Sequence, residues 1–278
     1  MPGTHVSAIQ SKEQALPAMK KEILGLHIRG NANLGDNYCH PLDYFNVGCD
    51  LDIALRKASL TDPPLDMEPD CVVLGGGAVS RRAPDVRKLY PKSKLVAWGV
   101  GYTTRKEIKP VPADVHYRLR SGYALYGCRD YVKGSGLDYV PCVSCMHPYF
   151  DSIPEPVHEL VVYGHRKLGD LSAEAAAMGA PYADNMSGLD LFRALDHLAS
   201  GSTVVTSSYH GAYWATLLGR KVAMVPFGSK FMSLKFRPAT VEGVKGASGK
   251  AVRFDEALGD SRDRNIAFRE RVLDLIWS

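Results

Sequence analysis

The residues best suited to chemistry stand together in one stretch of the chain, residues 202–236. Ser207 and Ser208 are of the types that cap helix N-termini, and Tyr209 and His210 follow them directly. The backbone N–H groups of a helix N-terminus bind anions, and a histidine gains or loses a proton near neutral pH. This turn predicts an anion site with His210 as acid or base, although a histidine making only a structural hydrogen bond fits the same pattern.

The sequence around this turn has the pattern of a strand, a helix and a second strand. Residues 203–206 are a β-branched run typical of a buried parallel strand, residues 211–218 are predicted to be helical, and residues 222–225 form the next strand. Ligands of open parallel sheets bind outside the carboxyl ends of the strands. Lys230 follows the second strand, so we expect it to reach the same edge as His210.

A second cluster of candidate residues follows the predicted strand at residues 160–163, where the chain reads His165, Arg166 and Lys167. Two fixed cations and a titratable histidine at a strand end favour an anionic ligand. A solvated loop has the same composition, so the two interpretations stay open at this point.

The first half of the chain contains four predicted buried strands, each followed by a glycine-rich or polar loop. They span residues 23–28, 71–74, 95–98 and 124–126. The intervals between them leave room for crossover helices, which is typical of a doubly wound parallel sheet in an α/β fold.

Two of these loops could admit a ligand close to the backbone. The first contains Asn33, Gly35 and Asp36, and the second contains Gly76 and Gly77. Glycines allow a close approach of backbone N–H groups to a ligand. Glycines also occur in turns with positive φ and where chain segments cross closely, so a ligand-binding loop and a structural role both account for them.

The stretch 139–156 has four prolines and no helical period, and we interpret it as the connection between two domains. It contains Cys142 and Cys145 in a CxxC spacing, but no second pair with zinc-ligand spacing exists in the sequence. We therefore expect buried cysteines at the domain junction and no metal site. Residues 264–277 are amphipathic and predict a terminal helix that packs across a domain.

Composition bounds the class of protein. The chain has 278 residues, 45% of them hydrophobic and 23% charged, which suits two domains of ordinary size. A net charge of +4 is too small and too dispersed for a nucleic-acid surface. No apolar run approaches the roughly 20 residues of a membrane span, the N-terminal arm lacks the apolar core of a signal peptide, and six cysteines do not indicate a disulfide scaffold. We expect a cytoplasmic protein.

An ordered set of motifs resembles the polysaccharide pyruvyl transferase family. The set comprises NLGDN at 33–37, VVLGGGAV at 72–79, GVG at 99–101, CRD at 128–130 and SSYHGAYWATLLGRKVAMVPFGSK at 207–230. Membership implies two facing Rossmann-like domains similar to the B-type glycosyltransferase fold. It also implies a role in exopolysaccharide biosynthesis, with transfer of a pyruvyl group from phosphoenolpyruvate to two hydroxyls of a sugar or glycan as a cyclic ketal.

The resemblance implies an N-terminal acceptor domain at 22–150 and a C-terminal donor domain at 151–278. The catalytic residues are expected to be His210 and Asp36. The donor-binding residues are expected to be Ser207, Ser208, Tyr209, Gly211, His165, Arg166 and Lys230. The acceptor-binding residues are expected to be Asn33, Gly35, Gly76, Gly77 and Arg129. Phosphoenolpyruvate is the only small molecule implied besides the acceptor, with no cofactor.

One position departs from the family pattern. Members commonly have an arginine two residues before the histidine, and this chain has Ser208 there. Arg166 and Lys167 could supply the missing charge, or the chain could use a different donor. A metal-independent glycosyltransferase that uses a nucleotide sugar, and an inactive carbohydrate-binding relative, remain alternatives.

Overall fold

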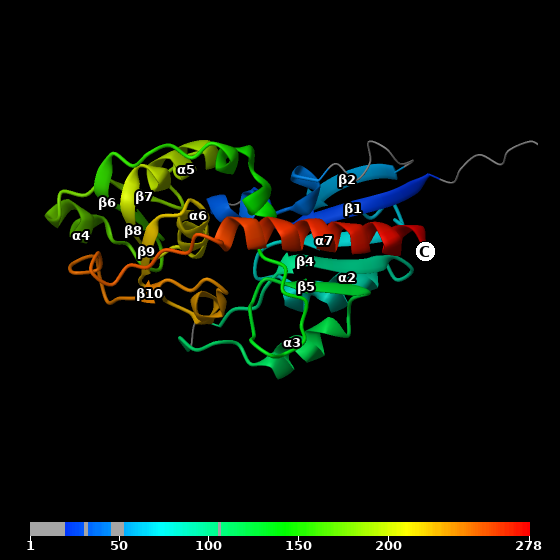
Figure 1. The fold of residues 1–278 in the computed structure, drawn as a ribbon. Helices are drawn as coiled ribbons and strands as arrows, with labels where there is room; N and C mark the ends of the chain where they lie inside the picture. The colour runs from blue at the N-terminus through cyan, green and yellow to red at the C-terminus, as the bar shows by residue number, and fades with distance from the viewer. Residues whose placement is uncertain (1–19, 31–32, 46–52, 105–106) are drawn as a thin grey trace, which may run out of the picture.

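The computed structural model describes residues 20–30, 33–45, 53–104 and 107–278, so the N-terminal arm lies outside the described residues. The described residues form two five-stranded sheets, and every strand pair in both sheets is parallel. Figure 1 shows the two sheets side by side along the molecule. The prediction of an α/β fold with two Rossmann-like domains is confirmed at this level.

The first sheet has the strand order β2-β1-β3-β4-β5. Its strands are β1 (Lys21–His27), β2 (Ile53–Ser59), β3 (Cys71–Gly75), β4 (Lys94–Val100) and β5 (Leu125–Cys128). The four strands expected in this half are present, and β2 was not expected. As an edge strand with only its first residue fully buried, β2 lacks the continuous apolar run that marks the central strands.

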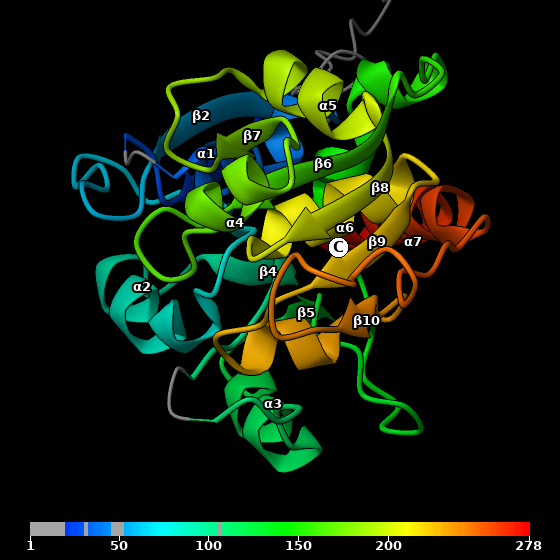
Figure 2. The ribbon, with the colours of Figure 1, turned by 90° about the vertical axis from the view of Figure 1, so that its left-hand side faces the viewer.

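The second sheet has the strand order β10-β9-β8-β6-β7 and faces the viewer in Figure 2. Its strands are β6 (His158–Gly164), β7 (Tyr182–Asp184), β8 (Gly201–Thr206), β9 (Lys221–Met224) and β10 (Ala239–Thr240). The outer strands β7 and β10 were not expected, because runs of three and two residues are too short to carry a strand pattern.

Both sheets follow the same winding. Counted from its own first strand, each has the order 2-1-3-4-5. The chain therefore reverses its direction of winding between β1 and β3 in the first sheet and between β6 and β8 in the second. The crevice at such a reversal point, outside the carboxyl ends of the strands, is where open α/β sheets bind ligands.

The helices fill the connections between these strands. They are α1 (Leu34–Asn37), α2 (Ala83–Leu89), α3 (Ala113–Arg120), α4 (Ser172–Ala177), α5 (Leu191–Ala199), α6 (Tyr209–Leu217) and α7 (Ala257–Trp277). Short 3₁₀ helices are η1 (Pro41–Asp43), η2 (Ser80–Arg82), η3 (Val143–Met146), η4 (Pro148–Asp151) and η5 (Ser229–Ser233). All nine residues of α6 are buried, as expected for a helix that is apolar around its whole circumference.

Helix α7 returns to the first domain after the second sheet is complete. Phe268, Val272 and Ile276 pack into one core cluster with Trp98 of β4. The indole N–H of Trp98 donates to Asn265 Oδ1 at 2.9 Å. Figure 1 shows the helix lying along the first sheet, so the chain crosses the domain junction a second time. An amphipathic pattern indicates that a helix packs on something but not on which sheet.

The described helices include none that is both long enough and apolar enough to cross a membrane.

Two neighbouring histidines lie in the interior of the first domain. His27 and His40 are 2% and 0% exposed, and their ring centroids are 4.8 Å apart. His40 Nδ1 accepts the Leu42 N–H at 3.1 Å and Nε2 lies 3.3 Å from the Val73 carbonyl oxygen, which fits a neutral ring. Burial lowers the pKa of His27 to about 4 and that of His40 well below its ordinary value, because it penalises the charged form.

Acidification is expected to destabilise the protein through His27. The unfolded chain binds a proton there below pH 6.5, whereas the folded protein does so only near its own pKa of about 4. The contribution is present above pH 6.5 and is lost as pH falls toward 4, by about 2 kcal/mol between pH 7 and pH 5. Urea unfolding at both pH values measures the loss. Between pH 7 and pH 5, the free energy of unfolding of the His27→Gln variant should fall by about 2 kcal/mol less than that of the parent. An equal fall in both proteins would contradict the assignment of this acid sensitivity to His27.

Candidate functional site

A cavity of about 190 Å³ lies between the two domains, where the reversal points of the two sheets face each other. The first domain lines it with Ile28, Asn33, Asp36, Ala78, Thr103 and Arg129. The second domain lines it with His165, Leu168, Tyr209, His210, Phe227 and Lys230. These residues follow the carboxyl ends of β1, β3, β4 and β5 in the first sheet and of β6, β8 and β9 in the second, so neither domain forms the cavity alone.

A larger hollow of about 550 Å³ lies elsewhere, beside His158, Ser202 and Lys221. These residues stand at the amino ends of β6, β8 and β9, opposite the edge where open parallel sheets bind ligands. We therefore place the candidate site in the smaller cavity between the domains.

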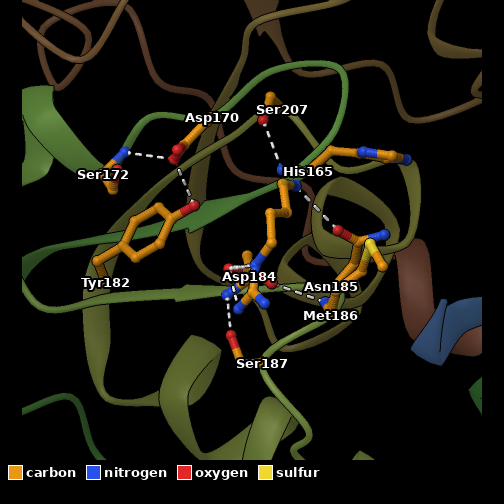
Figure 3. A network of polar contacts seen from close by, with 10 residues as sticks. His165, Asp170, Ser172, Tyr182, Asp184, Asn185, Met186, Ser187 and Ser207 are labelled. Carbon is orange, nitrogen blue, oxygen red and sulfur yellow. Dashed lines mark hydrogen bonds and ion pairs between the residues drawn. The ribbon is translucent and has the colours of Figure 1, made fainter. Parts of the chain in front are cut away.

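The serines before α6 hold the local backbone. Ser208 is the N-cap of α6, and its hydroxyl accepts the Gly211 N–H at 3.3 Å, as the sequence predicted. Ser207 Oγ accepts the His165 N–H at 2.9 Å and donates to the Gly169 carbonyl. Figure 3 shows the bond from Ser207 to His165. The two hydroxyls thus fix the turn that carries His210 and the loop that carries His165.

His210 is buried at the contact between the domains. Its Nδ1 edge lies against the backbone of Gly35 in α1, where a Cβ atom would overlap the imidazole. Its Nε2 lies 3.7 Å from Cys142 Sγ. Burial, and then the nearby cations Arg129 and Lys230, hold the pKa of His210 well below its ordinary value. The neutral form of the ring is therefore favoured near neutral pH.

Arg129 brings a buried positive charge to the cavity from the end of β5. The residue is 3% exposed, and its guanidinium carbon lies 4.4 Å from the centre of the Tyr209 ring. Its Nε and Nη1 have no hydrogen-bond partner among the described residues. Lys230 Nζ lies 5.8 Å from the same ring. Buried donors without a partner call for an explanation, and an anion in the adjoining cavity provides one.

Asp36 is oriented by a chain of amide contacts that crosses between the domains. Asn185 Nδ2 donates to Asn33 Oδ1 at 3.1 Å, and Asn33 Nδ2 donates to Asp36 Oδ2 at 2.9 Å. The Leu34 N–H donates to the Asn185 carbonyl at 3.1 Å. The carboxylate of Asp36 is thereby fixed in the wall of the cavity opposite the second domain.

Arg166 has a different environment from the one expected for a donor-binding cation. Its Nε and Nη2 both lie 2.9 Å from Asp184 Oδ2, and its side chain is 51% exposed. Figure 3 shows Asp184 within a network that includes Asn185, Met186 and Ser187. Arg166 is not among the residues that line the cavity.

The remaining expected residues divide into those that line the cavity and those beside it. The lining includes Asn33, Asp36, Arg129, His165, Tyr209, His210 and Lys230. Gly35 and Gly77 border it, since they lie next to His210 and Asp36. Ser207, Ser208, Gly211, Gly76 and Arg166 do not line it. Gly76 has φ +51° and lies against Cys39, so it serves a close chain contact.

Several neighbours of the site carry no recognisable sequence pattern. Phe227 and Thr103 line the cavity without any pattern that marks them. Cys142 and Cys145 are buried and free, as expected at a domain junction. The contact of Cys142 with His210 joins residues 68 positions apart, which no local spacing can reveal.

One group of metal-ligand residue types exists among the described residues, at His116, Cys128 and Asp130. The Cys128 thiol lies 3.4 Å from His116 Nδ1, whereas an Asp130 oxygen lies 3.6 Å from His116 Nε2. One imidazole offers a single nitrogen to a given ion, and the thiol and the carboxylate face different nitrogens of the ring, so the three residues form a poor ligand set. Burial lowers the pKa of His116 to about 4, which agrees with a neutral ring.

No protein-family model matches this chain, and no curated protein matches its sequence significantly. The resemblance to the pyruvyl transferases therefore stays a prediction that rests on the motifs and their order.

Replacing Gly35 with alanine is expected to destabilise the protein by roughly 1–3 kcal/mol, because the added methyl group must displace the His210 ring from a packed interface. Urea unfolding measures this change. Gly259→Ala in α7 is the control, since nothing lies within 4 Å of a Cβ there and alanine stabilises a helix by roughly 0.5–1 kcal/mol relative to glycine. An unchanged stability of Gly35→Ala would show that His210 does not rest on this backbone.

Proposed function

We propose that the chain is a transferase that moves a pyruvyl group from phosphoenolpyruvate to two hydroxyls of a sugar or glycan precursor, with its domains facing each other as in B-type glycosyltransferases. The observation that carries the proposal is a small cavity between the domains that is lined by Arg129, a buried cation with two nitrogens that have no partner among the described residues. The motif order supports the reaction class, and the cavity supports a small anionic donor.

The volume of the cavity favours a small donor. Sites for drug-sized ligands measure about 300–1,000 Å³. The cavity between the domains measures about 190 Å³, which is less than a nucleotide sugar requires and enough for a three-carbon acid with one phosphate. Size therefore favours phosphoenolpyruvate over the nucleotide-sugar alternative.

The charges of the cavity match the two anionic groups of phosphoenolpyruvate. Arg129 offers a planar fork suited to two oxygens of a phosphate or carboxylate, and Lys230 offers a point charge. In this proposal Arg129 supplies the cation that the family commonly places at the position of Ser208. Arg129 then belongs to the donor site rather than to the acceptor site expected from the motif order.

Pyruvyl transfer requires several proton movements. A proton adds to the methylene carbon of phosphoenolpyruvate, the first sugar hydroxyl bonds to the neighbouring carbon with loss of its proton, and the C–O bond to phosphate breaks. The second hydroxyl then bonds to that carbon and loses its proton, which closes the ketal. One released proton balances the proton added to carbon, and the other leaves with phosphate. His210 and Asp36 are the cavity residues that we propose for these transfers.

The donor itself is expected to change the protonation of His210. Burial lowers the pKa of His210 most, and the nearby cations Arg129 and Lys230 lower it further. A bound phosphate and carboxylate offset these cations, and a nearby anion favours the imidazolium. Donor binding thus prepares His210 to carry a proton at the pH of the cell.

Phosphoenolpyruvate is therefore expected to raise the pKa of His210, because its anionic groups stabilise the charged ring. An NMR titration of the His210 ring with and without saturating phosphoenolpyruvate measures the shift. Glucose, a neutral ligand, is the control and should leave the pKa unchanged. A pKa that stays constant or falls in bound phosphoenolpyruvate would remove His210 from the donor site.

Arg129→Ala is expected to weaken phosphoenolpyruvate binding by about 30-fold or more, since losing one partner of a buried charge pair costs about 2 kcal/mol or more. Isothermal titration calorimetry measures the affinity. Arg193→Ala, an exposed arginine on α5, is the control and should bind as the parent does. A parent protein that binds a nucleotide sugar but not phosphoenolpyruvate would overturn the proposal in favour of glycosyl transfer.

A further inference from the structure

A chain of three buried contacts leads from the core to His210. The indole Nε1–H of Trp214 donates to Ser144 Oγ at 2.9 Å. Ser144 Oγ lies 3.2 Å from Cys142 Sγ, which lies 3.7 Å from His210 Nε2. Trp214, Ser144 and Cys142 are at most 1% exposed, and His210 is 6% exposed. The first three residues lie outside the cavity lining, so any effect that they have on a bound ligand acts through His210.

The indole N–H of Trp214 determines which atom donates and which accepts at each contact in this series. An indole N–H can only donate, so the Ser144 oxygen must accept from Trp214. In the described part of the protein, the other contact of Ser144 Oγ is the sulfur of Cys142, so the hydroxyl donates to sulfur. The thiol keeps one proton, and the acceptor facing it is His210 Nε2.

The opposite direction leaves a buried proton without an acceptor. It requires His210 Nε2–H to donate to sulfur. If Ser144 Oγ also donates to sulfur, the thiol proton has no acceptor among the described residues. If the thiol instead donates to Ser144 Oγ, that oxygen receives two protons, from Trp214 and from Cys142, and its own hydroxyl proton has no acceptor there. A buried donor without a partner is strongly disfavoured.

We infer that Cys142 and Ser144 are positioning residues that hold neutral His210 with its proton on Nδ1, the nitrogen that lies against Gly35. A ligand group that reaches this edge of the ring meets an N–H donor and must be an acceptor, such as a phosphate or carboxylate oxygen. The tautomer follows from the hydrogen bonds alone. Only its use in binding the donor anion rests on the proposed function.

Nitrogen chemical shifts of the His210 ring test the inference. In uniformly ¹⁵N-labelled full-length protein near pH 7.5, long-range ¹H–¹⁵N correlations distinguish Nδ1–H from Nε2–H. We expect the Nδ1–H form in about tenfold excess or more in the parent. Cys142→Ser keeps a donor at this position and should keep the excess, whereas Cys142→Ala should lose it.

Cys145→Ala controls for loss of a buried cysteine at the same junction and should retain the Nδ1–H form. A parent spectrum with mainly Nε2–H overturns the inference, and so does a folded Cys142→Ala variant that keeps the parent tautomer ratio. If Cys142→Ala does not fold, the parent and Cys142→Ser spectra decide, because Nε2–H in either contradicts the direction of the chain.

Phosphoenolpyruvate binding, measured separately by calorimetry, keeps the two proposals apart. Nδ1–H without phosphoenolpyruvate binding supports the tautomer and removes the proposed donor. Binding of phosphoenolpyruvate to a protein with Nε2–H supports the proposed donor and overturns the inferred tautomer.

Discussion

The packing of the His210 ring on the backbone of Gly35 is the contact on which the candidate site depends. It joins the first turn of α6 in the second domain to α1 in the first, and it leaves no room for a side chain at position 35. The amide chain from Asn185 through Asn33 crosses the same junction. Close approach of the two domains at this point brings two sheet edges together around one cavity, with the His210 imidazole in its wall.

The cavity contains a buried charge that the protein only partly compensates. Arg129 lies over the Tyr209 ring, yet two of its nitrogens have no partner among the described residues. Its neighbour Asp130 is also buried, and burial raises the pKa of that carboxyl to about 6 against the opposing effects of Arg129 and the Tyr102 N–H. A desolvated cation is costly to hold, so its place beside a cavity fits a site prepared for an anion.

The repeated winding of the sheets explains why the site lies between the domains. Each domain has the order 2-1-3-4-5 and so has one reversal point, and the two reversal points face each other. Helix α7 returns to the first domain and packs on Trp98, while the connection carrying Cys142 contacts α6 in the second. The chain therefore links the domains at several positions besides the cavity, which supports a fixed geometry around His210.

The sequence by itself determined the features that local patterns encode. Buried β-branched runs marked the central strands, Ser208 was recognisable as a helix cap, and strand ends placed His210, Asp36 and Lys230 at ligand-binding edges. The short strands at the sheet edges carried no such pattern. Only the tertiary structure decided which cation enters the cavity, because Arg129 and Arg166 both follow strand ends, yet one faces Tyr209 and the other pairs with Asp184. That choice, like the contact of Cys142 with His210, depends on how the two domains pack against each other. Residue spacing along the chain does not encode that packing, because the contacting residues are far apart in the sequence.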